Sequence, residues 1–103
     1  MSEYKNLYEF NSEWKATRVV MDRNLNDASV SFCVTFSNGV EEKTLEFIRA
    51  DDPENIIEFM DFECVTVLEE LNAERDFCKI KVELISDCYS ELWCDAVLLR
   101  SAD

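Results

Sequence analysis

The sequence predicts a mainly β protein, an antiparallel meander or small sandwich of five to six strands with one or two short helices. Apolar and polar residues alternate in several short segments, which is the pattern of half-buried strands. Turn-forming residues separate these segments at intervals of about ten residues. Two segments carry helical spacing instead, so an α+β fold is the alternative class.

The N-terminal segment is the first to show helical spacing. Leu7, Phe10 and Trp14 stand three and four residues apart, which predicts a short helix before the first strand. The following residues, WKATRVVMD at 14–22, are predicted to form that strand. The polar stretch RNLND at 23–27 then predicts a turn.

The strongest strand signal lies in the stretch ASVSFCVTFS. Its apolar residues alternate strictly with small or polar ones: Val30, Phe32, Val34 and Phe36. The sequence SNG follows at 37–39, and Asn and Gly both tolerate the positive φ of tight hairpin turns. We therefore expect a hairpin whose return strand is EEKTLEFIR at 41–49.

The middle of the chain begins with a helix-start signature, ADDPEN. Asp52 is a capping residue, Pro53 fits the first helical position and Glu54 suits the positive end of the helix dipole. These features predict a turn or two of helix. The face expected to pin it to the sheet comprises Ile56, Ile57 and Met60.

The C-terminal half predicts further strands. FECVTVLEE at 62–70 is the first of them, although a helix over 65–76 is an alternative that the β-branched run Val65 to Val67 disfavours. The remaining segments are predicted in order as a loop, a strand, a turn and a last strand: 71–76, 77–86, 86–91 and 92–100.

Length and charge narrow the class of function. The 103 residues form one domain, 1–103, with a formal net charge of −13. This charge disfavours direct binding to nucleic acid or to an anionic membrane and favours a basic protein partner. The stretch 51–76 holds ten acids and one base, Arg75. Because solubility alone does not require such segregation, the asymmetry favours a binding surface over a merely solvated one.

The reactive residues argue against an enzyme. The chain has no histidine, which removes the common catalytic triads, histidine metal sites and the usual proton shuttle. We expect no metal and no cofactor: calcium ligation by Asp51, Asp52 and Glu54 would lack the usual loop, and Pro53 interrupts the run. The five cysteines show no CxxC spacing and are predicted to be free thiols, mostly buried: Cys33, Cys64, Cys78, Cys88 and Cys94.

The first residues carry neither a basic start nor an apolar run, and no segment approaches the roughly 20 apolar residues that cross a bilayer. A cytoplasmic location is therefore expected. Among the aromatic residues, Trp14 and Trp93 are predicted in the core. Tyr89, inside the predicted turn SDCYSE, is the aromatic residue expected to be exposed as an interface anchor.

The layout of residues 14–68 resembles the small, acidic, β-rich immunity proteins that bacteria make against secreted toxins. The features that carry this resemblance are WKATRVV, VSFCVTF, LEFIR and MDFECVTV with its acidic surroundings. The resemblance implies a cytoplasmic inhibitor that covers the basic active site of a nuclease-like toxin. It matches no single immunity family, so it carries over no binding residues.

The charge pattern and the resemblance predict an acidic protein-binding inhibitor whose contacts lie mainly in the acidic middle, residues 51–76. Two alternatives remain: a phage-type nucleic-acid mimic that antagonises a DNA-binding or defence protein, and a non-catalytic structural or assembly protein. The oligomeric state stays open. The predicted partner-binding residues are Asp51, Asp52, Glu54, Glu58, Asp61, Glu69, Glu70, Glu74, Asp76 and Tyr89.

Overall fold

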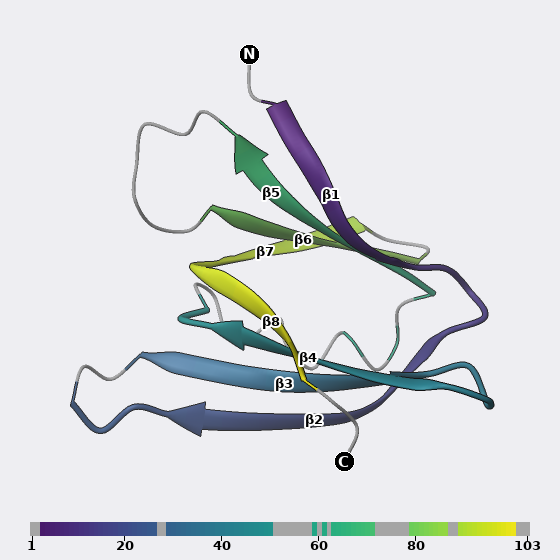
Figure 1. The fold of residues 1–103 in the computed structure, drawn as a ribbon, viewed down its shortest axis with the longest axis horizontal. Helices are drawn as coiled ribbons and strands as arrows, with labels where there is room; N and C mark the ends of the chain where they lie inside the picture. Colours follow the sequence, from purple (N-terminus) through teal and green to yellow (C-terminus); the bar gives the residue numbers. More distant parts are fainter. Residues whose placement is uncertain are drawn as a thin grey trace.

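The computed structural model shows two four-stranded antiparallel sheets packed face to face (Figure 1). It describes residues 3–26, 29–50, 59, 61, 63–71, 79–86 and 89–100. Sheet I contains, in spatial order, β1 (Glu3–Phe10), β5 (Cys64–Leu71), β6 (Ile80–Ile85) and β7 (Tyr89–Cys94). Sheet II contains β2 (Lys15–Arg23), β3 (Val30–Ser37), β4 (Glu42–Ile48) and β8 (Ala96–Arg100).

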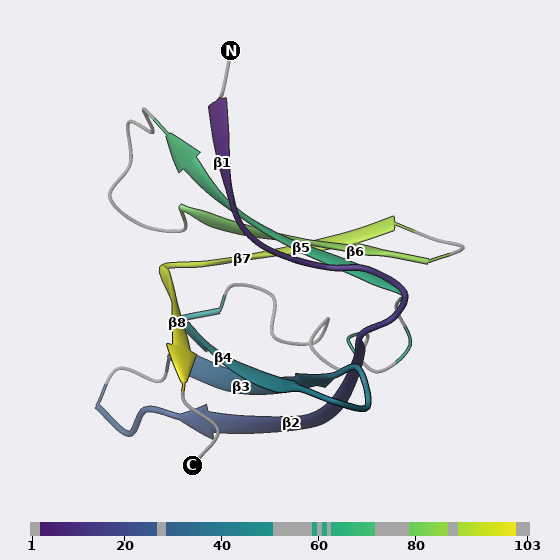
Figure 2. The ribbon, with the colours of Figure 1, turned by 45° about the vertical axis from the view of Figure 1, so that its right-hand side comes forward.

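The predicted mainly β, antiparallel class is confirmed, and the sandwich is the form it takes. Figure 2 shows the two layers, with the chain passing between them from β1 to β2 and again from β7 to β8. The described residues form eight strands instead of the five to six expected. The two additional strands arise at the N-terminus and at residue 95.

The N-terminal helix prediction is wrong, because residues 3–10 form strand β1. The register of β1 against β5 shifts between Asn6 and Tyr8, which marks a β-bulge at Leu7. The extra residue lets Leu7 and Tyr8 both pack against the core together with Phe10. This bulged strand therefore produces the apolar spacing that resembles one face of a helix.

The two hairpins of sheet II follow the sequence closely. Strands β3 and β4 pair in register through the predicted turn, where Gly39 has a φ of 92°. The Asn38 side chain accepts hydrogen bonds from the backbone N–H of Val40 and Glu41 at 2.9 and 2.7 Å. At the β2–β3 turn, Asn24 accepts from the N–H of Asn26 at 2.8 Å. Asparagine side chains thus stabilise both turns locally.

The predicted short helix at 51–60 lies outside the described residues except for Phe59. That side chain is buried and lies between the aromatic rings of sheet II. Its ring centroid is 5.7 Å from that of Phe32, 6.1 Å from Phe36 and 5.9 Å from Phe47. The segment therefore contributes to the core through Phe59, while Ile56, Ile57 and Met60 lie outside the described residues.

The C-terminal half contains the second difference. The strand predicted at 62–70 is confirmed as β5, and β6 confirms the next strand. The alternative helix over 65–76 is wrong at 65–71, and its remaining residues lie outside the described part of the chain. The last predicted strand, 92–100, is instead split at Asp95 between β7 of sheet I and β8 of sheet II. Asp95 donates its backbone N–H to the carbonyl of Ile48 at 2.9 Å, and its carboxylate lies 4.0 Å from Arg49. These contacts fix the corner.

The core lies between the sheets and is mainly aromatic and aliphatic. Phe10 of sheet I stacks on Phe36 of sheet II with ring centroids 4.0 Å apart, and Phe32 stacks on Phe47 at 4.8 Å. A fully buried phenylalanine contributes roughly 1.5–3 kcal/mol relative to an exposed one, so this cluster is a major source of stability. In the part of the chain that is described, no helix is long and apolar enough to span a membrane.

The cysteines divide between the core and the outer faces. Cys94 is fully buried, as predicted for a small apolar side chain. Cys33 and Cys64 are free and half-buried. Burial raises the pKa of the Cys33 thiol and nearby Glu46 adds to the effect, which disfavours the reactive thiolate. Cys78 and Cys88 lie outside the described residues.

Candidate functional site

Four of the predicted partner-binding residues lie in the described part of the chain. Asp61 and Tyr89 are exposed, Glu69 is half-buried and Glu70 is buried, with 9% of its surface accessible. The other predicted contacts lie outside the described residues: Asp51, Asp52, Glu54, Glu58, Glu74 and Asp76.

The described acids do not share one surface. Glu69 and Glu70 are consecutive in β5, so their side chains leave opposite faces of sheet I. Glu69 lies opposite Lys5 of β1, and Glu70 lies opposite Tyr4. Tyr89 lies opposite Ile85, which in turn lies opposite Cys64 at the other end of β5. At about 3.3 Å per residue, Tyr89 and Glu70 are therefore roughly 20 Å apart along the strands.

The outer face of sheet I does bring a group of distant residues together. Residues that alternate with the buried Val82 and Leu92 point outward from β6 and β7. In the register, Lys81 lies opposite Trp93 and Leu68, and Glu83 lies opposite Glu91. We call this group the aromatic face; it comprises Tyr4, Leu68, Lys81, Glu83, Ile85, Tyr89, Glu91 and Trp93.

Lys81 occupies the centre of the aromatic face. Its Nζ atom lies 3.5 Å from Glu83 and 3.4 Å from Glu91. The same ammonium group lies over two rings, 5.2 Å from the centroid of Tyr4 and 5.8 Å from that of Trp93. Burial alone would lower the pKa of Lys81, but the two glutamates outweigh it and the pKa is raised.

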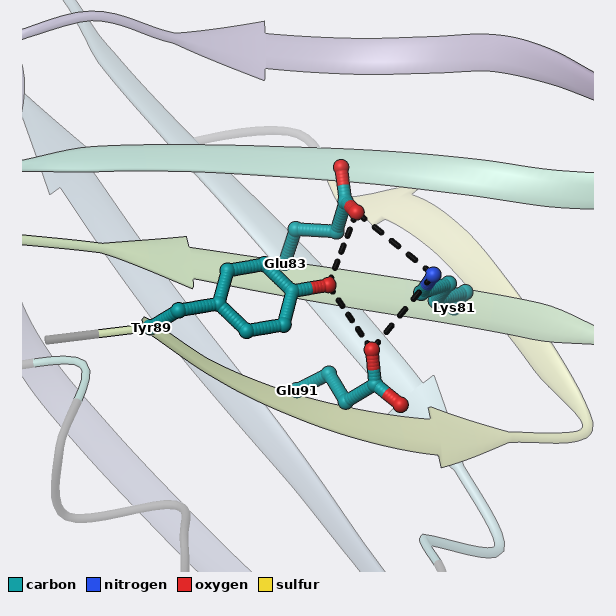
Figure 3. Close-up of polar contacts among 4 residues, drawn as sticks. All are labelled: Lys81, Glu83, Tyr89 and Glu91. Atoms are coloured by element: carbon teal, nitrogen blue, oxygen red, sulfur yellow. Dashed lines mark hydrogen bonds and ion pairs between the residues drawn. The ribbon is translucent and has the colours of Figure 1, made fainter.

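Tyr89 contacts the same two glutamates as Lys81 (Figure 3). Its hydroxyl oxygen lies 2.8 Å from Oε2 of Glu83 and 2.7 Å from Oε2 of Glu91. A phenol has one proton, so Tyr89 donates to one carboxylate at a time, while the Lys81 ammonium bridges both. The hydroxyl end loses water between the carboxylates, and this burial together with the hydrogen bonds raises the pKa of Tyr89.

The opposed glutamates make this an unusual strand pair. Like charges directly opposite one another on neighbouring strands repel, and Glu83 and Glu91 occupy such a pair. The hydrogen bond from Tyr89 lowers the pKa of Glu91. Burial raises this pKa, the positive charge of Lys81 lowers it, and the net shift is downward. Two carboxylates against one ammonium leave the network with a net negative charge, so the aromatic face retains attraction for a further cation.

The exposure of the aromatic face suits protein recognition. Tyr89 is 54% exposed, Ile85 41% and Tyr4 39%. Tyrosine and tryptophan are enriched at the centres of protein interfaces. In the described part of the chain, no group of three or more potential metal ligands is present.

The sequence identified part of this face. The exposure of Tyr89 was predicted correctly, but the residue begins strand β7 instead of lying in a turn. Trp93 was predicted in the core and is half-buried on the outer face, because its neighbours Leu92 and Cys94 fill the core positions of β7. Trp14 does pack against the core, 5.4 Å from Phe10. The alternation in residues 80–85 indicated that Lys81 and Glu83 face outward, but it did not indicate their partner Glu91.

Comparison of the chain with protein-family models, with curated proteins and with solved structures found no match.

Proposed function

We propose that the protein is an acidic protein-binding inhibitor of the immunity type, which covers the basic active site of a toxin such as a nuclease. The observation that carries the proposal is the aromatic face, where exposed Tyr89 contacts the opposed pair Glu83 and Glu91 and exposed Tyr4 lies against Lys81. The protein would act without catalysis or cofactor, in the cytoplasm of the bacterium that makes it.

Two physical effects support this function. The net charge of −13 accelerates the approach of a cationic partner, since complementary fields raise association rates strongly at low salt. After encounter, affinity depends on a few desolvated anchors, for which tyrosine and tryptophan are the favoured side chains. The aromatic face supplies anchors and negative charge at one location, which suits a compact cationic cleft.

The direct test is affinity capture by the full-length protein at low salt from a lysate of its host, with elution by rising salt. We expect elution of a basic protein whose enzymatic activity the purified chain inhibits. If the captured protein bound with an association rate indifferent to salt, electrostatic recognition would be wrong.

A triple variant separates the two acidic regions. Changing Asp51, Asp52 and Glu54 to lysine removes charge from the acidic middle while leaving the aromatic face intact. Loss of capture with retained folding would locate the contacts in the acidic middle. Normal capture would exclude these three residues and favour the aromatic face.

The principal alternative is a nucleic-acid mimic. A mimic requires an extended ladder of acids spaced like phosphates, whereas a plug for an active site requires a compact cluster. On the aromatic face the acids alternate with tyrosine, tryptophan and lysine, which supports the compact arrangement. A captured protein that bound DNA without cleaving it, and that DNA displaced from the chain, would favour the mimic.

A further inference from the structure

Strand β7 forms one edge of sheet I and carries part of the aromatic face. β7 is the last strand in the order β1-β5-β6-β7, so among the described strands it has a neighbour on one side only. Edge strands are normally protected against pairing by bulges, lysine, proline or short length. β1 and β2 both carry bulges, at Leu7 and Thr17. β7 pairs with β6 without any shift over six residues and contains neither lysine nor proline.

The backbone of β7 presents hydrogen-bonding groups on that side. Glu70 donates its N–H to the carbonyl of Lys79 at 2.7 Å, which identifies the hydrogen-bonded pairs of β5 and β6. Because such pairs alternate along antiparallel strands, Val82 and Leu92 form a hydrogen-bonded pair of β6 and β7. The N–H and C=O groups of Tyr89 and Glu91 therefore point away from β6, toward the edge.

We propose that a segment of the basic partner adds to β7 as a further antiparallel strand of sheet I. The addition would satisfy the edge groups of Tyr89 and Glu91, and a basic residue of the segment would lie opposite Glu91. Apolar residues two positions away on either side would lie opposite Tyr89 and Trp93. The preferred segment thus has the pattern apolar-x-basic-x-apolar.

Charge complementarity selects this occupant. The network of Lys81, Glu83 and Glu91 has a net negative charge, and the Glu91 side chain is 40% exposed, so a lysine or arginine opposite it has a carboxylate to bind. A second copy of this chain is disfavoured, since it would bring another formal charge of −13. The edge strand β8 suits a basic segment less well because it ends in Arg100, which already pairs with Glu46.

This inference rests on the proposed function, because it specifies how the aromatic face takes its basic partner. A synthetic peptide tests it independently of the partner's identity. The probe is a fluorescent seven-residue peptide with valine-threonine-lysine-threonine-valine at its centre, titrated with the full-length protein at low salt and followed by anisotropy.

Backbone methylation of the peptide distinguishes strand addition from simple charge attraction. Methylating the amide nitrogens of lysine and the two valines removes the donors that face β7, and we expect at least about tenfold weaker binding. Methylating the two threonine amides leaves those donors intact, and binding should persist. Equal affinities for the two methylated peptides would overturn strand addition.

Protein variants provide the matched controls. Glu91→Gln should weaken binding of the unmethylated peptide several-fold, whereas Glu42→Gln on sheet II should leave it unchanged. A glutamate in place of the peptide lysine should abolish binding. If the unmethylated peptide showed no binding at millimolar concentration, the inference would be wrong even where affinity capture had yielded an inhibited basic protein, so the two proposals fail separately.

Discussion

The outer faces of the two sheets use different chemistry. Sheet I presents the aromatic face, with an ammonium group held between two rings and two carboxylates. Sheet II presents the small side chains Ser31, Cys33 and Thr35 of β3. Beside them lie exposed Val20 and Leu98 and the ion pair of Glu46 with Arg100. There the Thr35 and Thr44 hydroxyls hydrogen-bond across strands at 2.9 Å.

This difference shows that charge alone does not locate a binding site on so acidic a chain. On sheet II, the Glu46 carboxylate pairs with Arg100 one to one, which leaves that pair neutral. On sheet I, two opposed glutamates share one lysine and one phenol proton. Among the described residues, only those of sheet I combine excess negative charge with exposed aromatic side chains, so recognition is expected there.

The largest effect should separate the two faces in partner binding. Changing Glu83 and Glu91 to lysine should weaken binding of the captured basic partner about a hundredfold, because an attractive charge pair becomes repulsive. Changing Glu41 and Glu42 to lysine alters the net charge equally on exposed positions and should cost less than about threefold. Surface plasmon resonance at fixed salt measures both.

If lysine at positions 83 and 91 impairs folding, the milder double variant with glutamine at both positions replaces it. Circular dichroism establishes folding for each variant before binding is measured. Equal losses for the sheet I and control variants would mean that total charge, not the aromatic face, governs recognition.

The next largest effect should be on the free energy of unfolding when the cation of each outer face is removed. Lys81→Met leaves Glu83 and Glu91 opposed without an ammonium, and we expect a loss of about 2 kcal/mol in the free energy of unfolding. Arg100→Met removes the more exposed cation of sheet II and should cost within about 0.5 kcal/mol. Urea unfolding measures both, and added salt should reduce the Lys81 penalty. Equal costs would contradict the distinction between the faces.

A smaller effect should mark the phenol of Tyr89. Tyr89→Phe removes the hydrogen bond to the glutamates and should cost about 1 kcal/mol near neutral pH. Because the pKa of Tyr89 is raised in the folded protein, its stabilising contribution is fully present below about pH 10 and is lost as pH rises further. The stability difference between wild type and variant should therefore shrink in strong alkali.

Urea unfolding at several pH values checks this dependence, and phenolate absorbance should show one step fewer in the variant. Tyr8→Phe is the control, since Tyr8 packs against the core from β1 and not within the network. A difference between wild type and Tyr89→Phe that grew above pH 10 would contradict the sign.

The smallest effect should come from sheet II. Thr44→Val replaces one partner of the hydroxyl pair with a side chain of similar shape that suits strands, so the change should cost about 0.5 kcal/mol. Partner binding should remain unchanged. Weakened partner binding would mean that the outer face of sheet II also takes part in recognition.

Several elements of the fold were predictable because their signals are local. The alternation of Phe32, Val34 and Phe36 determined β3 and its buried side, and Asn38 with Gly39 determined the hairpin to β4. The β-branched run beginning at Val65 correctly favoured strand over helix. In each case the deciding interactions lie within a few residues of the chain.

Other features depend on contacts between distant segments. The bulge at Leu7 is defined by the pairing of β1 with β5. It gives the strand an apolar spacing that resembles that of a helix. The corner at Asp95 depends on Ile48 and Arg49, which lie far away in sequence. The pair of Glu83 and Glu91 exists only because β6 and β7 align in that register.

The sequence by itself determined the β class, the excess of negative charge and the outward direction of residues such as Lys81. The tertiary structure decided which outward residues meet. Trp93 lies on the outer face and not in the expected core, and the Lys81 ammonium lies over both its ring and that of Tyr4. The Tyr89 hydroxyl lies within hydrogen-bond distance of two carboxylates. The reason is physical: side-chain alternation is fixed along one strand, whereas neighbours across strands depend on register and bulges, which the whole core selects.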